Sequence, residues 1–385
     1  MGSDEISQGH ISGRQLMMLL AFFMGTKVLY FFPTVMSMKS GSSAWLSIVV
    51  STGVALLGLW GWLLWIGVTG ESGFVVSLRE TCGRLLGDAI ATAILALLVM
   101  MTALNTRLFT GGAVIGVVPA FSMDALIWIS SLSAIYAAWL GIESVGRAAG
   151  FFFTPTLLSL GMVMLSLSKT FDIANLNPFW GFGAKNTVVQ GLVSTGMFGG
   201  IIAVPIVKSY VRKQEGIPKR SVNGTLIAAA VLILGLVSVA GMFPYPMSAR
   251  KVEPLSVMAR SVYLGRFVQR IESLFIFTWY FSTSVQTSFS YALILILLSQ
   301  LSGTGTYRPF VPAVAILTFG VAALPANTLM GGQLMDRFFT TTGGTVLVFL
   351  GWALYALAAA RGIPSAAGGE SQSDDGRQKA KPTGR

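Results

Sequence analysis

Three ionisable side chains fall inside apolar stretches of the sequence, where a charge is costly. Lys27 lies in MGTKVLYFFP, Arg107 in LNTRLF and Glu272 in QRIESLFIF. At membrane depth, such groups pair with one another or face a ligand or ion pathway. A pair between Glu272 and either Lys27 or Arg107 is therefore a candidate structural ion pair or a candidate ligand or gating site, and both alternatives stay open.

Uncharged polar side chains occur in two of the same runs. Asn105 lies in the third apolar run, and Tyr280, Thr283, Ser284 and Thr287 lie in the eighth. These side chains are candidates to line a ligand pocket, and the adjacent hydroxyls of Thr283 and Ser284 are candidates to bind a sodium ion. The alternative is that each hydroxyl bonds a carbonyl of its own helix four residues earlier, which is common in membrane helices.

The sequence offers few candidate residues for catalysis or metal binding. Glu143 and Arg147 are spaced i,i+4 in LGIESVGR and favour a salt bridge that holds an inner loop. The chain has one histidine and one cysteine, which excludes a zinc site or a Cys/His catalytic pair built from them. The sequence contains no Walker A, GxSxG or HExxH motif. We expect no catalytic residue, no metal site and no cofactor.

The composition indicates a membrane protein. The chain has 385 residues, of which 54% are hydrophobic and 11% are charged, whereas soluble domains carry about 25% charged residues. Too few charges are present to cover the surface of a soluble fold of this size. The formal net charge is +11, and the basic residues lie mostly between apolar runs, as expected where loops meet anionic lipid headgroups.

Ten apolar runs are long enough to cross a bilayer as helices. Lys and Arg are more frequent in alternate loops, which favours both termini in the cytoplasm. We divide the chain into a cytoplasmic N-terminus at 1–14, a membrane domain at 15–360 and a disordered cytoplasmic tail at 361–385. The predicted spans are roughly 15–37, 42–67, 89–118, 123–140, 147–168, 187–210, 222–243, 266–300, 309–326 and 334–360.

Glycine and proline interrupt the first and sixth runs at matching places. Gly25 precedes Pro33 in the first run, and Gly196 precedes Pro205 in STGMFGGIIAVP. With five spans in each half, this predicts a 5+5 inverted repeat whose broken helices expose backbone N–H and C=O groups to a ligand. Such groups suit a zwitterion such as an amino acid. The alternative is that the glycines only allow close helix packing.

Longer stretches resemble one known family. ISGRQLMMLLAFFMGTKVLYFFP, followed by AWLSIVVSTGVALL, is similar to the start of the B subunits of bacterial spore germinant receptors. SLRETCGRLLG, YAAWLGIESVGR and RFVQRIESLFIFTWYFSTSVQTSFSYA are similar to later parts of these subunits. The resemblance covers roughly 10–360. It implies the amino acid–polyamine–organocation transporter superfamily and an all-α, LeuT-type 5+5 fold of ten helices with helices 1 and 6 broken.

The resemblance also implies the place of a ligand site, at the two breaks and on one face of the eighth span. The sixth run lacks the acidic residue of many relatives, and the fifth lacks the lysine of proton-coupled ones. Phe198 and Tyr280 are candidate pocket walls. The residues that carry over are Gly25, Thr26 and Lys27 in the first span, Thr195, Gly196, Met197, Phe198, Gly199 and Gly200 in the sixth, and Ser284 and Thr287 in the eighth.

Two functions fit this pattern. The resemblance implies a subunit that senses a nutrient such as an amino acid in the spore inner membrane, together with a larger A-type subunit and a C-type lipoprotein. A ligand would signal by binding one conformation better than another. The alternative is an amino-acid permease that works by alternating access. The same pocket serves both, so the sequence does not separate them.

Overall fold

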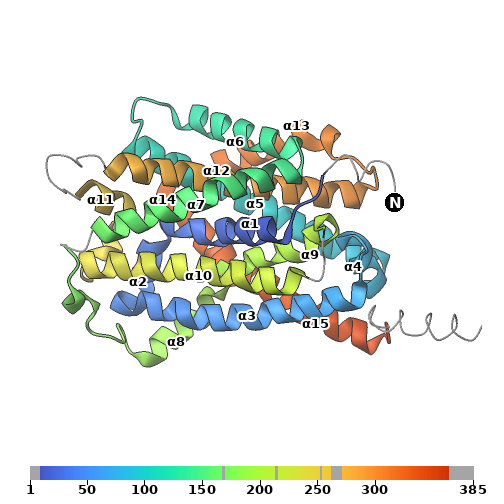
Figure 1. The fold of residues 1–385 in the computed structure, drawn as a ribbon, viewed down its shortest axis with the longest axis horizontal. Coiled ribbons are helices and arrows are strands. Elements are labelled where there is room, and N and C mark those ends of the chain that lie inside the picture. Colours follow the sequence, from blue (N-terminus) through green and yellow to red (C-terminus); the bar gives the residue numbers. More distant parts are fainter. Residues whose placement is uncertain (1–8, 167–169, 213–215, 252–253, 262–270, 364–385) are drawn as a thin grey trace, which may run out of the picture.

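The protein is a bundle of membrane-spanning helices (Figure 1). The computed structural model describes residues 9–166, 170–212, 216–251, 254–261 and 271–363. In this part of the chain, seven helical segments are long and apolar enough to cross a bilayer. They are Phe32–Thr69, Arg84–Ile115, Ile142–Leu165, Ala184–Tyr210, Ile217–Met242, Ser273–Ser302 and Thr328–Ala360.

The remaining spans are short or divided. Two shorter apolar helices cover Met123–Trp139 and Arg308–Ala323. The first span has one piece at Gly13–Gly25, and its second piece joins the second span within Phe32–Thr69. Counted this way, the described helices account for the ten predicted spans, and the predicted all-α membrane fold is confirmed.

The first of the five spans in the N-terminal half begins at a well-defined helix cap. Ser12 accepts a hydrogen bond from the Gln15 amide at 3.2 Å, and the Gln15 side chain accepts one from the Ser12 amide at 2.7 Å. This reciprocal capping fixes the start of the first helix. The elements are α1 (Gly13–Gly25), η2 (Thr26–Leu29), α2 (Phe32–Ser40), η3 (Gly41–Ser43), α3 (Ala44–Thr69), α4 (Phe74–Cys82), α5 (Arg84–Gly116), α6 (Met123–Trp139) and α7 (Ile142–Ser166).

The second half repeats the pattern of an interrupted span followed by long helices. Its elements are η5 (Ile173–Leu176), α8 (Ala184–Val193), η6 (Ser194–Ile202), α9 (Ala203–Val207), η7 (Lys208–Tyr210), α10 (Ile217–Met242), η9 (Ser248–Arg250), α11 (Pro254–Ser261), α12 (Ile271–Ser302), η10 (Arg308–Phe310), α13 (Val311–Ala323), α14 (Thr328–Met335), η11 (Asp336–Gly343) and α15 (Gly344–Ala360).

Helices α1 and α12 form the centre of the bundle. In Figure 1, α1 runs between α7 and α10, and it packs on both of them and on α12. The most apolar window of α12 is 83% buried inside the protein, against 28% for α7. An apolar helix that is not buried by protein faces lipid. The first and eighth spans are therefore positioned to enclose a site, and α7 forms part of the outer surface.

Two pairs of hydrogen bonds close the end of the bundle at which α1 begins and α4 lies (Figure 1). The Ile11 amide donates to the Tyr210 carbonyl at 2.8 Å, and the Arg212 amide donates to the Ile11 carbonyl at 3.1 Å. The buried Lys208 ammonium donates to Thr69 Oγ1 at 2.8 Å and to Ser77 Oγ at 3.0 Å. The end of the sixth span is thereby bonded to the N-terminal segment, α3 and α4.

Candidate functional site

The first span is broken beside a buried lysine. Helix α1 ends at Gly25, η2 makes a tighter turn, and Tyr30 is extended with φ −108° and ψ −151° before α2 begins. Lys27 lies in this break, is buried, and donates from Nζ to the Met197 carbonyl at 2.6 Å. The lysine thus joins the break in the first span to the irregular part of the sixth.

The sixth span loses its α-helical winding at its centre. Between α8 and α9, the nine residues of η6 form a 3-10 helix, a longer run than this poorer geometry usually sustains. A side chain at Gly196 would collide with the carbonyls of Phe339 and Thr340, and Gly199 lies against Gly344. These glycines therefore allow close packing as well as the interruption, so both readings of the glycine pattern apply.

A third irregular segment lies in the last span. The eight residues of η11, Asp336–Gly343, form a π-helix between α14 and α15. Such segments are rare and occur frequently at functional sites. This interruption was not predicted from the sequence. The pair Gly343 and Gly344, at its junction with α15, is the signal that was available.

These three segments and α5 surround a pocket at the centre of the bundle. The free space is about 40 Å³, room for roughly three water molecules at 10–15 Å³ each. Only a small ligand, or one that expands the pocket, can occupy it. The lining residues are Lys27, Tyr30, Phe31, Phe32, Val35, Asn105, Leu108, Met197, Gly332, Met335, Asp336, Phe339 and Thr340.

Asn105 is the unusual polar group of this central pocket. Its side chain is 2% exposed, and neither Oδ1 nor Nδ2 has a hydrogen-bond partner in the described structure. Buried amides are almost always satisfied, so an amide with both atoms unpaired needs an explanation. The pocket therefore presents one donor and one acceptor close to the lysine of the first break.

The other charges of the central pocket are paired. Asp336, at the start of η11, forms a salt bridge with Lys39 at the end of α2, with Nζ and Oδ2 2.7 Å apart. Lys39 and Asp336 are each about one-fifth exposed. This pair ties the second half of the first span to the last span, at the opposite end of the first span from Ile11.

The central pocket is linked to the eighth span by Tyr30. The Tyr30 hydroxyl is hydrogen-bonded to Thr283 Oγ1 at 2.8 Å and to Gln286 Oε1 at 3.2 Å. Sequence reasoning missed Tyr30 and Gln286 as site residues. Both lie in apolar runs next to residues that were selected, and only the packing shows which side of α12 faces the break.

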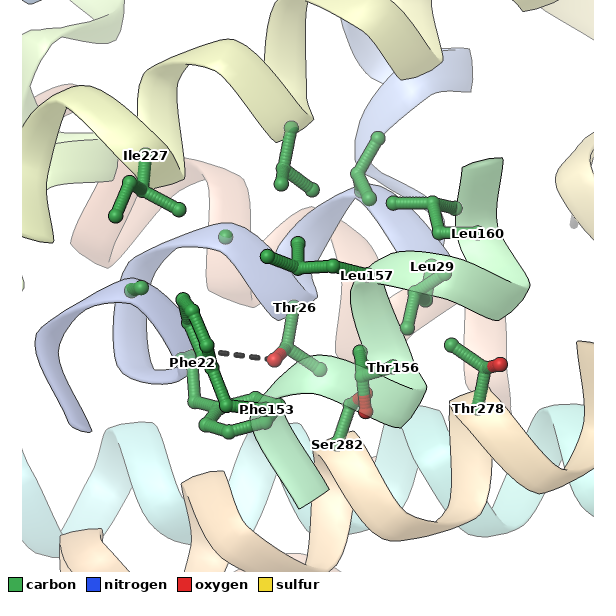
Figure 2. Close-up of a pocket in the computed structure, with 14 residues that line it drawn as sticks. Phe22, Thr26, Leu29, Phe153, Thr156, Leu157, Leu160, Ile227, Thr278 and Ser282 are labelled. Carbon is green, nitrogen blue, oxygen red and sulfur yellow. Dashed lines mark hydrogen bonds between the residues drawn. The ribbon is translucent and has the colours of Figure 1, made fainter. Parts of the chain in front are cut away.

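The structure distributes the predicted ligand residues over several places. Lys27, Asn105 and Met197 line the central pocket. Gly25 and Thr26 line a second pocket on the other side of the break (Figure 2). The remaining sixth-span residues are buried within η6, where the three glycines pack against neighbouring helices. These residues are Thr195, Gly196, Phe198, Gly199 and Gly200.

The predicted residues of the eighth span lie elsewhere. Tyr280, Ser284 and Thr287 line a small crevice between α5, α6 and α12. Ser284 donates to the Tyr280 carbonyl at 2.8 Å, and Thr283 Oγ1 donates to the Trp279 carbonyl at 2.7 Å. These hydroxyls follow the alternative of bonding to their own helix. In the described chain, no group of three or more His, Cys, Asp or Glu is placed to hold a metal ion.

The predicted charge pairs have different outcomes. Glu143 and Arg147 form a salt bridge of 2.6 Å in α7. Arg107 is buried, and its Nε has no partner among the described residues. The side chain of Glu272 lies outside the described residues, so its pairing with Lys27 or Arg107 stays a prediction. Lys27 and Asn105, predicted from different spans, meet at the central pocket.

Comparison with known proteins places this arrangement in a family. A family described as "Spore germination protein" matches residues 10–328. The chain belongs to the spore germination protein family. This family member is 24% identical over 212 residues to "Spore germination protein A2" of Bacillus subtilis (strain 168), a match that covers 54% of this chain and 58% of that relative. The matched region therefore spans little more than half the length of the relative.

The fold of this spore germination family member is that of a LeuT-type transporter. Its structure is similar to that of MhsT, solved in complex with L-phenylalanine, with a TM-score of 0.65 and 14% sequence identity. The similarity covers 91% of this chain and 89% of MhsT. It confirms the 5+5 fold class with helices 1 and 6 broken, and it assigns no ligand.

Proposed function

We propose that the protein is the nutrient-sensing subunit of a spore germination receptor, with a small amino acid as its ligand. The observation that carries this proposal is the buried amide of Asn105 in the central pocket, which has no hydrogen-bond partner among the described residues. An unsatisfied buried amide costs free energy until a ligand supplies the missing bonds. Family membership favours germination as the process.

The chemistry of the pocket favours a zwitterion. The Lys27 ammonium and the Asn105 amide donor can bind a carboxylate, because charge-assisted hydrogen bonds to carboxylates are strong. The Asn105 amide oxygen and the Met197 carbonyl, which Lys27 now engages, can accept hydrogen bonds from an ammonium group. The aromatic rings of Phe31 and Phe339 line the same pocket and suit an apolar side chain.

The direct test is a thermal-shift screen of the purified full-length protein against the common L-amino acids, with sugars and nucleosides as alternatives. A ligand at about one hundred times its Kd adds about 2.7 kcal/mol of stability. Asn105→Leu should keep or raise the basal Tm, because it removes an unsatisfied amide, and should abolish the ligand-induced shift. Thr102→Val, one turn earlier on α5, is the matched control, since its hydroxyl donates to the Leu98 carbonyl of its own helix and Thr102 is not among the described residues that line the central pocket.

An unchanged shift in Asn105→Leu would contradict the proposed site. A shift with sugars or nucleosides but with no amino acid would contradict the ligand class and leave the site in place. The screen therefore separates the two parts of the proposal.

The second candidate function is an amino-acid permease, which the structural similarity to MhsT favours. Uptake of labelled amino acid into liposomes by the purified protein would support the permease. Binding without uptake would support the receptor. For the receptor, we propose the spore inner membrane as the location and an A-type membrane subunit and a C-type lipoprotein as partners. Co-purification from spores with both of them is the expected result.

A further inference from the structure

A second pocket lies on the side of the first span that faces α7 and α10 (Figure 2). Phe153 and Leu157 of α7 and Ile227 and Val231 of α10 form its apolar walls. Its floor is the C-terminal turn of α1 and a polar face of α12. None of the residues that line it carries a charge.

We call this second pocket the lateral pocket. Two hydroxyls that line it have no hydrogen-bond partner among the described residues. Thr156 is 8% exposed and Ser282 is 1% exposed, and neither hydroxyl has a hydrogen-bond partner in the described structure. The other two hydroxyls are satisfied by their own helices. Thr26 donates to the Phe22 carbonyl at 2.7 Å, and Thr278 donates to the Leu274 carbonyl at 2.9 Å. Thr156 and Ser282 can therefore bond a group from outside the protein that both donates and accepts.

The size of the lateral pocket limits which part of such a ligand can enter it. The free space is about 30 Å³, which holds roughly two atoms the size of a water oxygen. Only a small polar head fits at the hydroxyls. Helices α7 and α10 lie on opposite sides of α1 in Figure 1, and Leu157 on α7, which lines the pocket, is also exposed at the surface. A longer apolar body would extend outward between these two helices.

We propose that this pocket binds a neutral amphiphile from the bilayer, of the class of a primary alcohol with an alkyl chain. The alcohol hydroxyl would bond Thr156 and Ser282, and the chain would lie between α7 and α10. A charged head is disfavoured because none of the described residues that line the pocket carries a charge. The ligand would contact Gly25 and Thr26, so it binds beside the break in the first span and separately from the central pocket.

The test uses a photoactivatable diazirine analogue of 1-octanol with the full-length protein in lipid nanodiscs. Mass spectrometry should find the label on α7 and α10 peptides that contain Phe153–Leu157 and Ile227–Val231. The double variant Thr156→Val with Ser282→Ala should lose at least fivefold of this labelling. Thr278→Val is the matched control and should change it less than twofold, since that hydroxyl lines the same pocket but is already bonded.

A competition in the unmodified protein keeps the test independent of folding. Excess 1-octanol should displace the label, and excess 1-chlorooctane, which lacks the hydroxyl, should not. Equal labelling of the double variant, equal competition by both compounds, or label spread evenly over the lipid-facing helices would each overturn the proposal. The Asn105→Leu variant should label normally, so this result is separate from that for the central pocket.

Discussion

At the scale of single residues, Lys27 and Asn105 meet at one pocket but differ in their partners. The Lys27 ammonium donates to the Met197 carbonyl, whereas neither polar atom of the Asn105 amide has a partner in the part of the chain that the structure describes. A ligand can therefore bind Asn105 without breaking a bond of the protein, but it must compete with Met197 for Lys27. In the proposed site, Asn105 therefore anchors the ligand, and Lys27 exchanges its bond to Met197 for one to the ligand.

Replacement of the lysine tests this role. Lys27→Met keeps the length and burial of the side chain and removes its charge. A hydrogen bond from a charged group contributes about 1.5–3 kcal/mol, so we expect the Kd for a carboxylate ligand to rise roughly tenfold to hundredfold. Isothermal titration calorimetry measures this Kd. Lys185→Met, at an exposed position of α8, is the control, and equal affinities of the two variants would show that Lys27 does not contact the ligand.

The sequence predicted candidate pocket residues by their type alone, and helix packing decided which of them line the central pocket. Lys27 and Asn105 are polar groups in apolar runs, so their type alone selected them. Ser284 and Thr287 were selected on the same grounds, but the rotation of α12 directs them toward α5 and α6. Thr283 and Gln286 are the α12 residues that bond Tyr30. A helix face is set by its neighbours, which the local sequence does not specify.

At the scale of elements, the interruptions of the sixth and last spans depend on one another. Gly196 in η6 faces the carbonyls of Phe339 and Thr340 in η11. The 3-10 helix and the π-helix can approach this closely because no side chain separates them. The glycine and proline pattern predicted the breaks of spans one and six. The π-helix contains no proline, and its sequence signal is limited to Gly343 and Gly344 at the junction with α15, so this interruption was harder to predict.

The contact between these two elements makes a prediction about stability. Gly196→Ala places a methyl group against the backbone of η11, and overpacking typically costs about 1–3 kcal/mol. We expect a clear fall in the thermal unfolding midpoint in detergent. Gly53→Ala is the control, because no atom lies within 4 Å of a side chain added there, and it should be neutral or stabilising. Equal midpoints would mean that η6 and η11 can separate at little cost.

Helix α4 carries the only cysteine of the chain, which makes its packing measurable. Burial raises the pKa of the Cys82 thiol, and the charge of Arg361 partly opposes this. Because the thiolate is the reactive form, alkylation by a maleimide should be slow at neutral pH and should speed up as the pH rises. Ser77→Ala removes one Lys208 bond to α4 and should increase the rate at fixed pH. An unchanged rate would show that this bond does not hold α4 in place.

At the scale of the whole molecule, the N-terminal segment closes one end of the bundle. Ile11 is fully buried and is bonded through its backbone to Tyr210 and Arg212. Ile11→Pro removes the amide that donates to Tyr210. We expect faster hydrogen exchange at the start of α1 and at the end of the sixth span. Ile11→Ala keeps the amide and loses only side-chain packing, so similar exchange in the two variants would assign the effect to packing alone.

The first span is attached at both of its ends and irregular between them. Its beginning is bonded to the sixth span through Ile11, and its far end is bonded to the tenth through Lys39 and Asp336. Both attachments oppose any lengthening or straightening of the stretch around Tyr30 that lies between them. If the proposed ligand acts on this stretch, we expect one of the two attachments to release, and the choice between them would determine on which side of the membrane the conformational change occurs.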